Sequence, residues 1–316
     1  MALFGSVSLV TNIAKGYALA DALRIAAGLG FGRVEIASIG GMCEHVRPEE
    51  INGEYIAALA GALKREKLEA YAFAGHVDLT LEKGLNDFLK KMELAAGIGC
   101  RIINTNAGPV ARMGDFRRNI KKVADKAERL GLTVGLESHG DIVGTAKDAA
   151  GLFRDINHPL IRMNYDFGNA YYYSGGTISV EEDILYASEF LAYVHIKDIR
   201  IDGANARYRP IGEGDLNYPA IFAALGQIYG EKKTRAGGAN DDMHEGVNRE
   251  AGAKHRKGDE TRDDRSAGAL HCGLEIPVFV SGTLDALSSD TAPIGADEIR
   301  RAAEQSMQYM RKSGAI

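Results

Sequence analysis

Apolar runs with the length of a buried β-strand recur along this chain at nearly constant intervals. The starts of eight such runs are separated by 27, 36, 32, 32, 28, 31 and 80 residues. A strand, a helix and their two connections take about 30 residues, so all intervals but the last fit one strand–helix unit. The eight runs are residues 6–12, 33–38, 69–75, 101–106, 133–138, 161–166, 192–197 and 272–278. This regularity predicts that strands and helices alternate along most of the chain.

The segments between these runs have the periodicity of amphipathic helices, and several end in glycine, which commonly follows a helix C-terminus. Strands that are apolar throughout are typical of a parallel sheet covered on both faces. A doubly wound dinucleotide-binding fold fits less well, because Gly28, Gly30 and Gly32 follow a predicted helix and not a strand. The pattern therefore predicts an α/β fold, a single (β/α)8 TIM barrel over residues 1–316.

Residues 230–268 do not fit the repeating pattern. They are dense in charge and glycine and nearly devoid of large apolar side chains. Such a segment buries too little apolar surface to offset the entropy lost on ordering it. We therefore expect a polar, mobile insertion before the eighth strand, which accounts for the interval of 80 residues.

The composition is that of a globular protein, with 45% hydrophobic and 26% charged residues. A net charge of −5 disfavours a nucleic-acid partner, because phosphate binding requires clustered Lys and Arg. The three cysteines are widely spaced and form no C-x-x-C motif, which predicts free thiols in a reducing compartment. No secretory leader and no apolar run of roughly 20 residues is present, so we expect a cytoplasmic protein without a membrane partner.

Polar residues stand at the carboxyl ends of the last four predicted strands, where the active site of such a barrel lies. Each strand contributes one residue, and these are Glu137, Asp166, His195 and Glu275. Charged residues within apolar strands are unfavourable unless they are paired or bind a cation. Three carboxylates and one imidazole suit Mn, Mg, Co or Zn better than a metal that prefers thiolates. The sequence therefore predicts a site for one divalent metal ion.

The order of these motifs resembles the xylose isomerase-like superfamily of sugar and sugar-phosphate isomerases and epimerases. The matching pieces are "GLESHG", "NYDFGNA", "VHIKD", "IGEGDLNYPAIFAAL", "GLEIP" and an early strand running into "FAGH", and they cover most of the chain outside 230–268. The resemblance implies four metal ligands, namely Glu137, Asp166, His195 and Glu275. It implies that Glu137 and Glu275 are also the catalytic acid/base pair. It further implies that the substrate site is lined by His76, His139, Lys197 and Arg209.

A hydroxyketone whose two oxygens bind a cation has an acidified α C–H, so a carboxylate can remove that proton and leave a cis-enediolate. A second carboxylate on the opposite face can return the proton, which gives epimerisation or, at the neighbouring carbon, isomerisation. We therefore expect a divalent-metal-dependent isomerase or epimerase of a small sugar, keto-sugar or cyclitol, with manganese among the candidate metals.

Two other functions stay open. Loss of a β-leaving group from the same intermediate would give a lyase, with His139 or Lys197 as the extra acid. Such a lyase would be a keto-inositol or dehydroshikimate-type dehydratase, or a C-glycoside-cleaving enzyme. A non-catalytic sugar-binding barrel is the alternative from another class.

The superfamily also resembles the zinc endonucleases that cleave at abasic DNA sites, and those enzymes need many more histidines at the strand ends. Here Asn169 stands three residues after Asp166, where such an enzyme would have a histidine, and the fourth strand ends in "NTNAGP". We therefore expect a small-molecule carbohydrate partner and no nucleic acid. Barrels of this type often form dimers or tetramers, so a homo-oligomer is possible on this resemblance.

Overall fold

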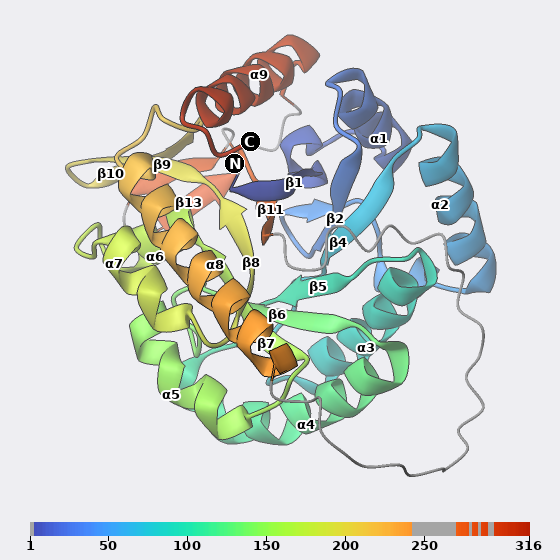
Figure 1. Cartoon of the computed structure of the whole chain (residues 1–316). Helices are drawn as coiled ribbons and strands as arrows, with labels where there is room; N and C mark the ends of the chain where they lie inside the picture. The colour runs from blue at the N-terminus through green and yellow to red at the C-terminus, as the bar shows by residue number, and fades with distance from the viewer. Residues whose placement is uncertain (1–2, 242–269, 278–279, 284–285, 290–293) are drawn as a thin grey trace.

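Eight parallel strands form a closed barrel in the computed structural model, which describes residues 3–241, 270–277, 280–283, 286–289 and 294–316 (Figure 1). The strands are β1 (Phe4–Val10), β2 (Arg33–Ile39), β4 (Glu69–Ala74), β5 (Ile102–Thr105), β6 (Thr133–Glu137), β7 (Ile161–Asp166), β8 (Leu191–Ile196) and β11 (Leu270–Leu274). Their order is β1-β11-β8-β7-β6-β5-β4-β2, and pairing between β1 and β2 closes the ring. The predicted TIM barrel is confirmed.

Helices form the outer layer around this ring (Figure 1). They are α1 (Leu19–Gly28), α2 (Gly53–Arg65), α3 (Glu82–Gly97), α4 (Met113–Leu130), α5 (Ala146–Ile156), α6 (Phe167–Tyr173), α7 (Val180–Asp183), α8 (Tyr218–Asp241) and α9 (Ala296–Lys312). Single 3-10 turns are η1 (Thr11–Ala14), η2 (Pro48–Glu50), η3 (Val110–Arg112) and η4 (Ile184–Ala187). The strand–helix alternation expected from the apolar runs therefore builds two concentric layers.

Helix α4 illustrates how the sequence specifies this outer layer. Its buried residues Phe116, Ile120, Val123 and Ala127 recur every three or four positions and so share one face. The residue after the helix is Gly131, whose φ of 62° lies in the left-handed region that glycine adopts without strain. The apolar face packs on the barrel while the charged residues of the helix face outward.

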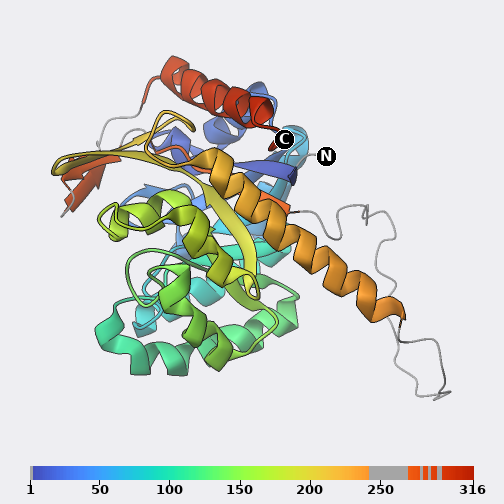
Figure 2. The same cartoon turned by 60° about the vertical axis from the view of Figure 1, so that its left-hand side comes forward.

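A second, smaller sheet lies at the carboxyl end of the barrel strands and was not predicted. It contains β9 (Asp198–Asp202), β10 (Asn205–Arg209), β12 (Val280–Thr283) and β13 (Ala286–Ser289), all antiparallel, in the order β13-β12-β10-β9. The two-residue strand β3 (Cys43–Glu44) pairs with β2. Strands β9 and β10 are polar and short, so they lack the apolar runs that reveal the barrel strands. Figure 2 shows this sheet at one end of the barrel and α8 extending past the other end.

Helix α8 continues to Asp241, beyond the residue at which we expected the polar insertion to begin. Residues 231–236 include Glu, Lys, Arg and Ala, which have high helix propensity and let the helix extend into this polar segment. Residues 242–268 of the expected insertion lie outside the described residues.

Neither a disulfide nor a membrane-crossing helix occurs in the part of the chain described here. Cys43, Cys100 and Cys272 are free thiols and all three are buried. None of the helices described is both long and apolar enough to cross a membrane. The free thiols agree with the interpretation of the cysteine spacing.

The carboxylate of Asp198, the first residue of β9, holds the loop of the "IGEGD" motif. It accepts hydrogen bonds from the backbone N–H groups of Gly212 and Gly214, each at 2.9 Å, and from its neighbour Ile199 at 2.9 Å. A Cβ on Gly214 would lie 2.0 Å from Oδ1 of Asp198 and 2.6 Å from the carbonyl oxygen of Ile199. The loop can therefore approach this carboxylate only with glycine at position 214.

Gly214→Ala is expected to lower the free energy of unfolding by about 2–4 kcal/mol, because the new methyl group displaces the loop from Asp198. Chemical denaturation of the purified protein measures this loss. Gly151→Ala in α5 is the matched control, since a Cβ there meets no atom within 4 Å. That control is expected to be neutral or stabilising by up to about 1 kcal/mol. Equal stability of the two variants would contradict the role given to Gly214.

Candidate metal and substrate site

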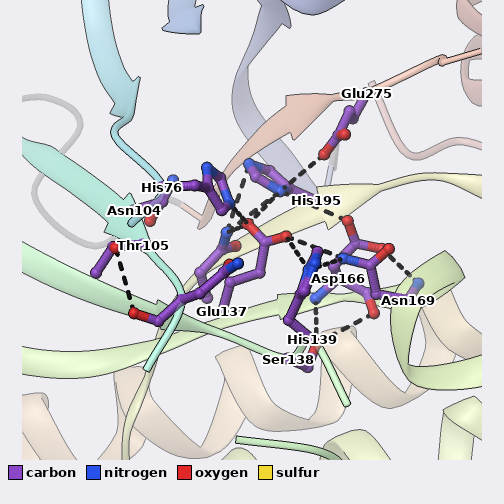
Figure 3. Close-up of polar contacts among 12 residues, drawn as sticks. His76, Asn104, Thr105, Glu137, Ser138, His139, Asp166, Asn169, His195 and Glu275 are labelled. Carbon is purple, nitrogen blue, oxygen red and sulfur yellow. Dashed lines mark hydrogen bonds and ion pairs between the residues drawn. The ribbon is translucent and has the colours of Figure 1, made fainter. Parts of the chain in front are cut away.

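Four adjacent strands bring the predicted metal ligands together at the carboxyl end of the barrel (Figure 3). Glu137, Asp166 and His195 lie at or next to the ends of β6, β7 and β8, and Glu275 follows β11. One potential ligand atom from each of the four lies within 4.8 Å of the others, and all four residues are buried. The structure thus forms one cluster from residues that are up to 138 positions apart in the sequence.

The imidazole of His195 lies at the centre of this cluster and is completely buried. Its Nδ1 is 3.0 Å from Oε2 of Glu137 and 3.1 Å from Oε2 of Glu275. The same Nδ1 is 3.6 Å from Oδ2 of Asp166. Burial would lower the pKa of His195, but the carboxylates of Glu35 and Glu137 raise it well above its usual value. The cluster therefore favours positive charge at the position faced by Nδ1.

The charge balance around His195 also fits a divalent cation. Besides the three carboxylates of the cluster, the carboxylate of Glu35 lies 3.0 Å from Nε2 of His195. The ammonium group of Lys197 contacts two of the three, Asp166 and Glu275. Buried carboxylates crowded in this way repel one another unless further positive charge lies among them. Three carboxylates and a histidine nitrogen directed at one point supply both the charge and the donor atoms that a divalent metal requires.

Side-chain donors surround the carboxylate of Glu137. His76 Nε2 is 3.0 Å from its Oε2, and Asn164 donates to the same oxygen at 2.9 Å. Asn169 donates to Oε1 at 3.0 Å. Burial would raise the pKa of Glu137, but the charges of His76 and His195 hold it well below its usual range. Glu137 is therefore an ionised carboxylate whose orientation is fixed by its donors.

Lys197 supplies positive charge next to Asp166 and Glu275 of the cluster. Its Nζ donates to Glu275 Oε1 at 2.9 Å, to Asp166 Oδ2 at 3.2 Å and to Asn169 Oδ1 at 3.1 Å. It also lies 4.7 Å from the centre of the Tyr208 ring. Burial lowers the pKa of Lys197, but Asp166 and Glu275 raise it well above its usual value. Lys197 is thus a fixed ammonium group that touches two of the four potential ligands.

Three of the four residues expected to line a substrate site lie beside this cluster. His76 and Lys197 contact it directly, and Nδ1 of His139 is 3.8 Å from Oε1 of Glu137. The side chain of His139 is 34% exposed, and its ring lies 5.1 Å from that of Tyr173, whose side chain is also partly exposed. His139 and Tyr173 therefore stand between the buried cluster and solvent.

The fourth of these residues, Arg209, is the last residue of β10. Neighbouring residues of a strand point to opposite faces, and in β10 it is Tyr208 that faces the cluster, where its hydroxyl donates to Asn169 Oδ1 at 3.0 Å. Arg209 lines a cavity of about 240 Å³ together with Tyr208 and with Glu298 and Arg301 of α9. Its expected place in the substrate site stays a prediction.

A comparison with known families identifies the fold more closely. Residues 23–229 match the model of the xylose isomerase-like TIM barrel family. The chain belongs to this family. No curated protein matches the chain.

Several solved structures resemble this member of the xylose isomerase-like family. A xylose isomerase-like TIM barrel protein from Mycobacterium smegmatis in complex with magnesium has 16% identity and a TM-score of 0.65, over 98% of this chain and 96% of that one. D-allulose 3-epimerase from Methylomonas sp. in complex with D-allulose has 16% identity and a TM-score of 0.64, over 99% of each chain. A probable 3-DHS dehydratase from Bacillus anthracis has 15% identity and a TM-score of 0.58, over 95% and 97%. At these identities the similarity shows the fold alone.

Several residues of this family member's site were missed or given no role by sequence reasoning. They are side chains that hydrogen-bond to the cluster or to its immediate partners, namely Asn12, Glu35, Asn104, Asn164, Asn169 and Tyr208. Asn12 joins the first and last barrel strands by donating to Glu275 Oε1 at 2.9 Å. The sequence feature that could have indicated these residues is a polar side chain inside or next to an apolar strand, as in "NYD" and "NTN".

Proposed function

We propose that this chain is a divalent-metal-dependent isomerase or epimerase of a small sugar, keto-sugar or cyclitol. The observation that carries the proposal is the placement of Glu137 and Glu275 at the two ends of a row of four adjacent strands, with His195 between them (Figure 3). A substrate bound at the cluster would therefore meet one carboxylate on each face. Similarity to D-allulose 3-epimerase in complex with D-allulose supports this choice of substrate class.

In the proposed reaction, a divalent cation held by Glu137, Asp166, His195 and Glu275 would polarise the substrate's carbonyl and adjacent hydroxyl oxygens. Glu137 accepts the proton from the α-carbon, and Glu275, after taking up a proton from solvent, donates it to the opposite face of the substrate. Glu137 then releases its proton to solvent, which restores the starting state. The assignment of Glu137 as the base is supported by its ionised state, which follows from its lowered pKa, and by the donors that fix its orientation.

Polar groups next to this acid/base pair have separate roles in the proposal. His76 orients Glu137 through their contact at 3.0 Å. Lys197 stabilises negative charge on the substrate oxygens, because it stays protonated beside Glu275. His139 lies closer to solvent and binds the more distal hydroxyl groups of the substrate.

Removal of divalent metal is expected to abolish exchange of the substrate α-proton, and addition of Mn²⁺, Mg²⁺ or Co²⁺ is expected to restore it. The measurement is incorporation of deuterium from D₂O into candidate ketoses, followed by mass spectrometry, with the metal content of the same sample determined in parallel. Undiminished exchange in protein that holds no metal would contradict the proposal.

A lyase is the second candidate, and the contact of Lys197 with both Glu275 and Asp166 favours it. A buried ammonium group next to the acid/base pair could donate a proton to a departing hydroxyl or aglycone, and the similarity to a probable 3-DHS dehydratase agrees with this chemistry. In the D₂O experiment, loss of water or an aglycone indicates the lyase, whereas deuterium without such loss indicates the isomerase. Ligand binding without either reaction, unchanged in Glu137→Gln, would instead indicate a non-catalytic sugar-binding barrel.

A further inference from the structure

Glu35 lies inside the barrel, behind His195 as seen from the metal-ligand cluster. It belongs to β2 and is completely buried. Its two carboxylate oxygens are 3.1 and 3.0 Å from Nε2 of His195, the ring nitrogen that faces away from the cluster. Asn104 of β5 donates to Oε1 of Glu35 at 2.8 Å. The carboxylate thus has two partners and no exposure to water.

Two glycines in other strands leave the space that this pair occupies. A Cβ on Gly273 of β11 would lie 2.6 Å from Oε2 of Glu35 and 2.9 Å from Cδ2 of His195. A Cβ on Gly135 of β6 would lie 2.2 Å from Oδ1 of Asn104. The interior of such a barrel is ordinarily filled by branched apolar side chains. Here the strands instead make room for a carboxylate at the back of the histidine.

Stability alone does not account for this arrangement. A buried ion pair is often no more stabilising than apolar side chains of the same volume, because both groups lose their hydration. The contact does, however, decide which nitrogen of His195 keeps its proton when a cation binds. A carboxylate is an acceptor only, so Nε2 keeps the proton that it donates to Glu35, and Nδ1 is the nitrogen whose proton a cation among Glu137, Asp166 and Glu275 would replace.

We infer that Glu35 is a positioning residue that holds His195 in the Nε2–H tautomer and strengthens Nδ1 as a metal donor. Without this carboxylate, a proton on Nδ1 would be stabilised by Glu137 and Glu275 and would compete with a cation for the same position. In other metal sites, loss of a group that hydrogen-bonds to the second nitrogen of a metal-binding histidine weakens metal binding by roughly 10–100-fold. The inference rests on the metal site of the proposed function, but it concerns metal affinity and not the reaction.

The first test compares Mn²⁺ binding to the full chain and to Glu35→Gln by isothermal titration calorimetry and by Mn²⁺ electron paramagnetic resonance. Glutamine keeps the shape of the side chain, but its amide can donate to Nε2 and so favours the proton on Nδ1. We expect the dissociation constant to rise by roughly 10–100-fold. Tyr193→Phe is the matched control, since it lies in the same strand as His195 and loses only a hydroxyl. Its affinity is expected to stay within about twofold.

The second test reads the tautomer directly in the unaltered protein. In a ¹⁵N-histidine sample loaded with Zn²⁺, long-range ¹H–¹⁵N spectra are expected to place the His195 proton on Nε2 and the metal on Nδ1. His195→Gln identifies the resonance. This measurement keeps the inference falsifiable even if Glu35→Gln does not fold, because zinc on Nε2 with the proton on Nδ1 would overturn it.

The outcomes separate this inference from the proposed function. Equal Mn²⁺ affinity of a folded Glu35→Gln variant and the unaltered chain overturns the role of Glu35 alone. Absence of Mn²⁺ binding by the unaltered chain overturns both proposals. Weaker binding by Glu35→Gln supports the inference even if no candidate sugar exchanges its proton in D₂O, a result that would count only against the proposed function.

Discussion

Glu137→Gln is expected to lower kcat/KM for α-proton exchange by roughly 10²–10⁴-fold, because it removes the proposed general base. The carboxylate of Glu137 accepts hydrogen bonds from Asn164 and Asn169. A glutamine at this position would direct its own NH₂ group at one of these two donors, so one hydrogen bond would be lost. Exchange of deuterium into the substrate at saturating Mn²⁺ is the measurement, with the bound metal quantified in the same samples. These conditions separate loss of the base from loss of the cation.

Two further variants sharpen this experiment. Glu275→Gln is expected to abolish formation of the second epimer. Glu137 is still expected to exchange the α-proton of the one epimer whose C–H bond faces it. Glu128→Gln is the matched control, since the carboxylate of Glu128 is exposed and lies outside the cluster. Full activity of Glu137→Gln would refute the paired-carboxylate mechanism, and so would full epimerisation by Glu275→Gln.

Lys197→Met is expected to lower the free energy of unfolding of the metal-free protein by about 3–5 kcal/mol. Methionine keeps most of the side-chain volume, but it leaves Asp166, Glu275 and the Asn169 carbonyl without their shared donor. The pKa of Lys197 lies well above its usual value, so the folded protein holds this proton more tightly than the unfolded chain does. This stabilisation is fully present through the neutral range, below the pKa of about 10.4 expected in the unfolded chain. Chemical denaturation at pH 7 measures the loss.

Divalent metal is expected to reverse part of this loss, because a cation bound among the carboxylates replaces the missing positive charge and stabilises the folded state by binding to it. The same reasoning predicts tighter Mn²⁺ binding by Lys197→Met than by the unaltered chain. Lys126→Met is the control, since the ion pair of Lys126 with the exposed Glu93 is worth less than about 1 kcal/mol. A loss below about 1 kcal/mol in Lys197→Met would contradict the view that this lysine holds the carboxylates together.

The barrel and the centre of its site could be predicted because both depend on local patterns. Each barrel strand is an apolar run, and in four consecutive strands a single acidic or imidazole side chain stands at or near the carboxyl end. The parallel fold then brings these ends together without further information. Glu137, Asp166, His195 and Glu275 are therefore adjacent for the same reason that the barrel could be recognised.

The remaining residues depend on contacts that no local pattern reveals. Whether Tyr208 or Arg209 faces the cluster is set by the pairing of β10 with β9, in which Tyr208 lies opposite Ile199. The role of Glu35 requires that β2 and β8 face each other across the barrel, although 160 positions separate Glu35 from His195. Likewise, the need for glycine at position 273 follows only from Glu35 and His195, which a Cβ at that position would contact.

The hydrogen bond from Asn12 to Glu275 spans 263 positions and closes the ring between its first and last strands. During synthesis, the ribosome adds Glu137, Asp166 and His195 before Glu275. It must add 80 residues after His195 to reach Glu275. At about 5–20 residues per second this interval lasts roughly 4–16 s. Throughout that time the nascent chain has only three of the four ligands, and its carboxylates have neither the ring nor the complete donor set around them. In the proposed function, metal capture would therefore come at the end of synthesis, and an ion held by all four side chains would mark a chain whose barrel has closed.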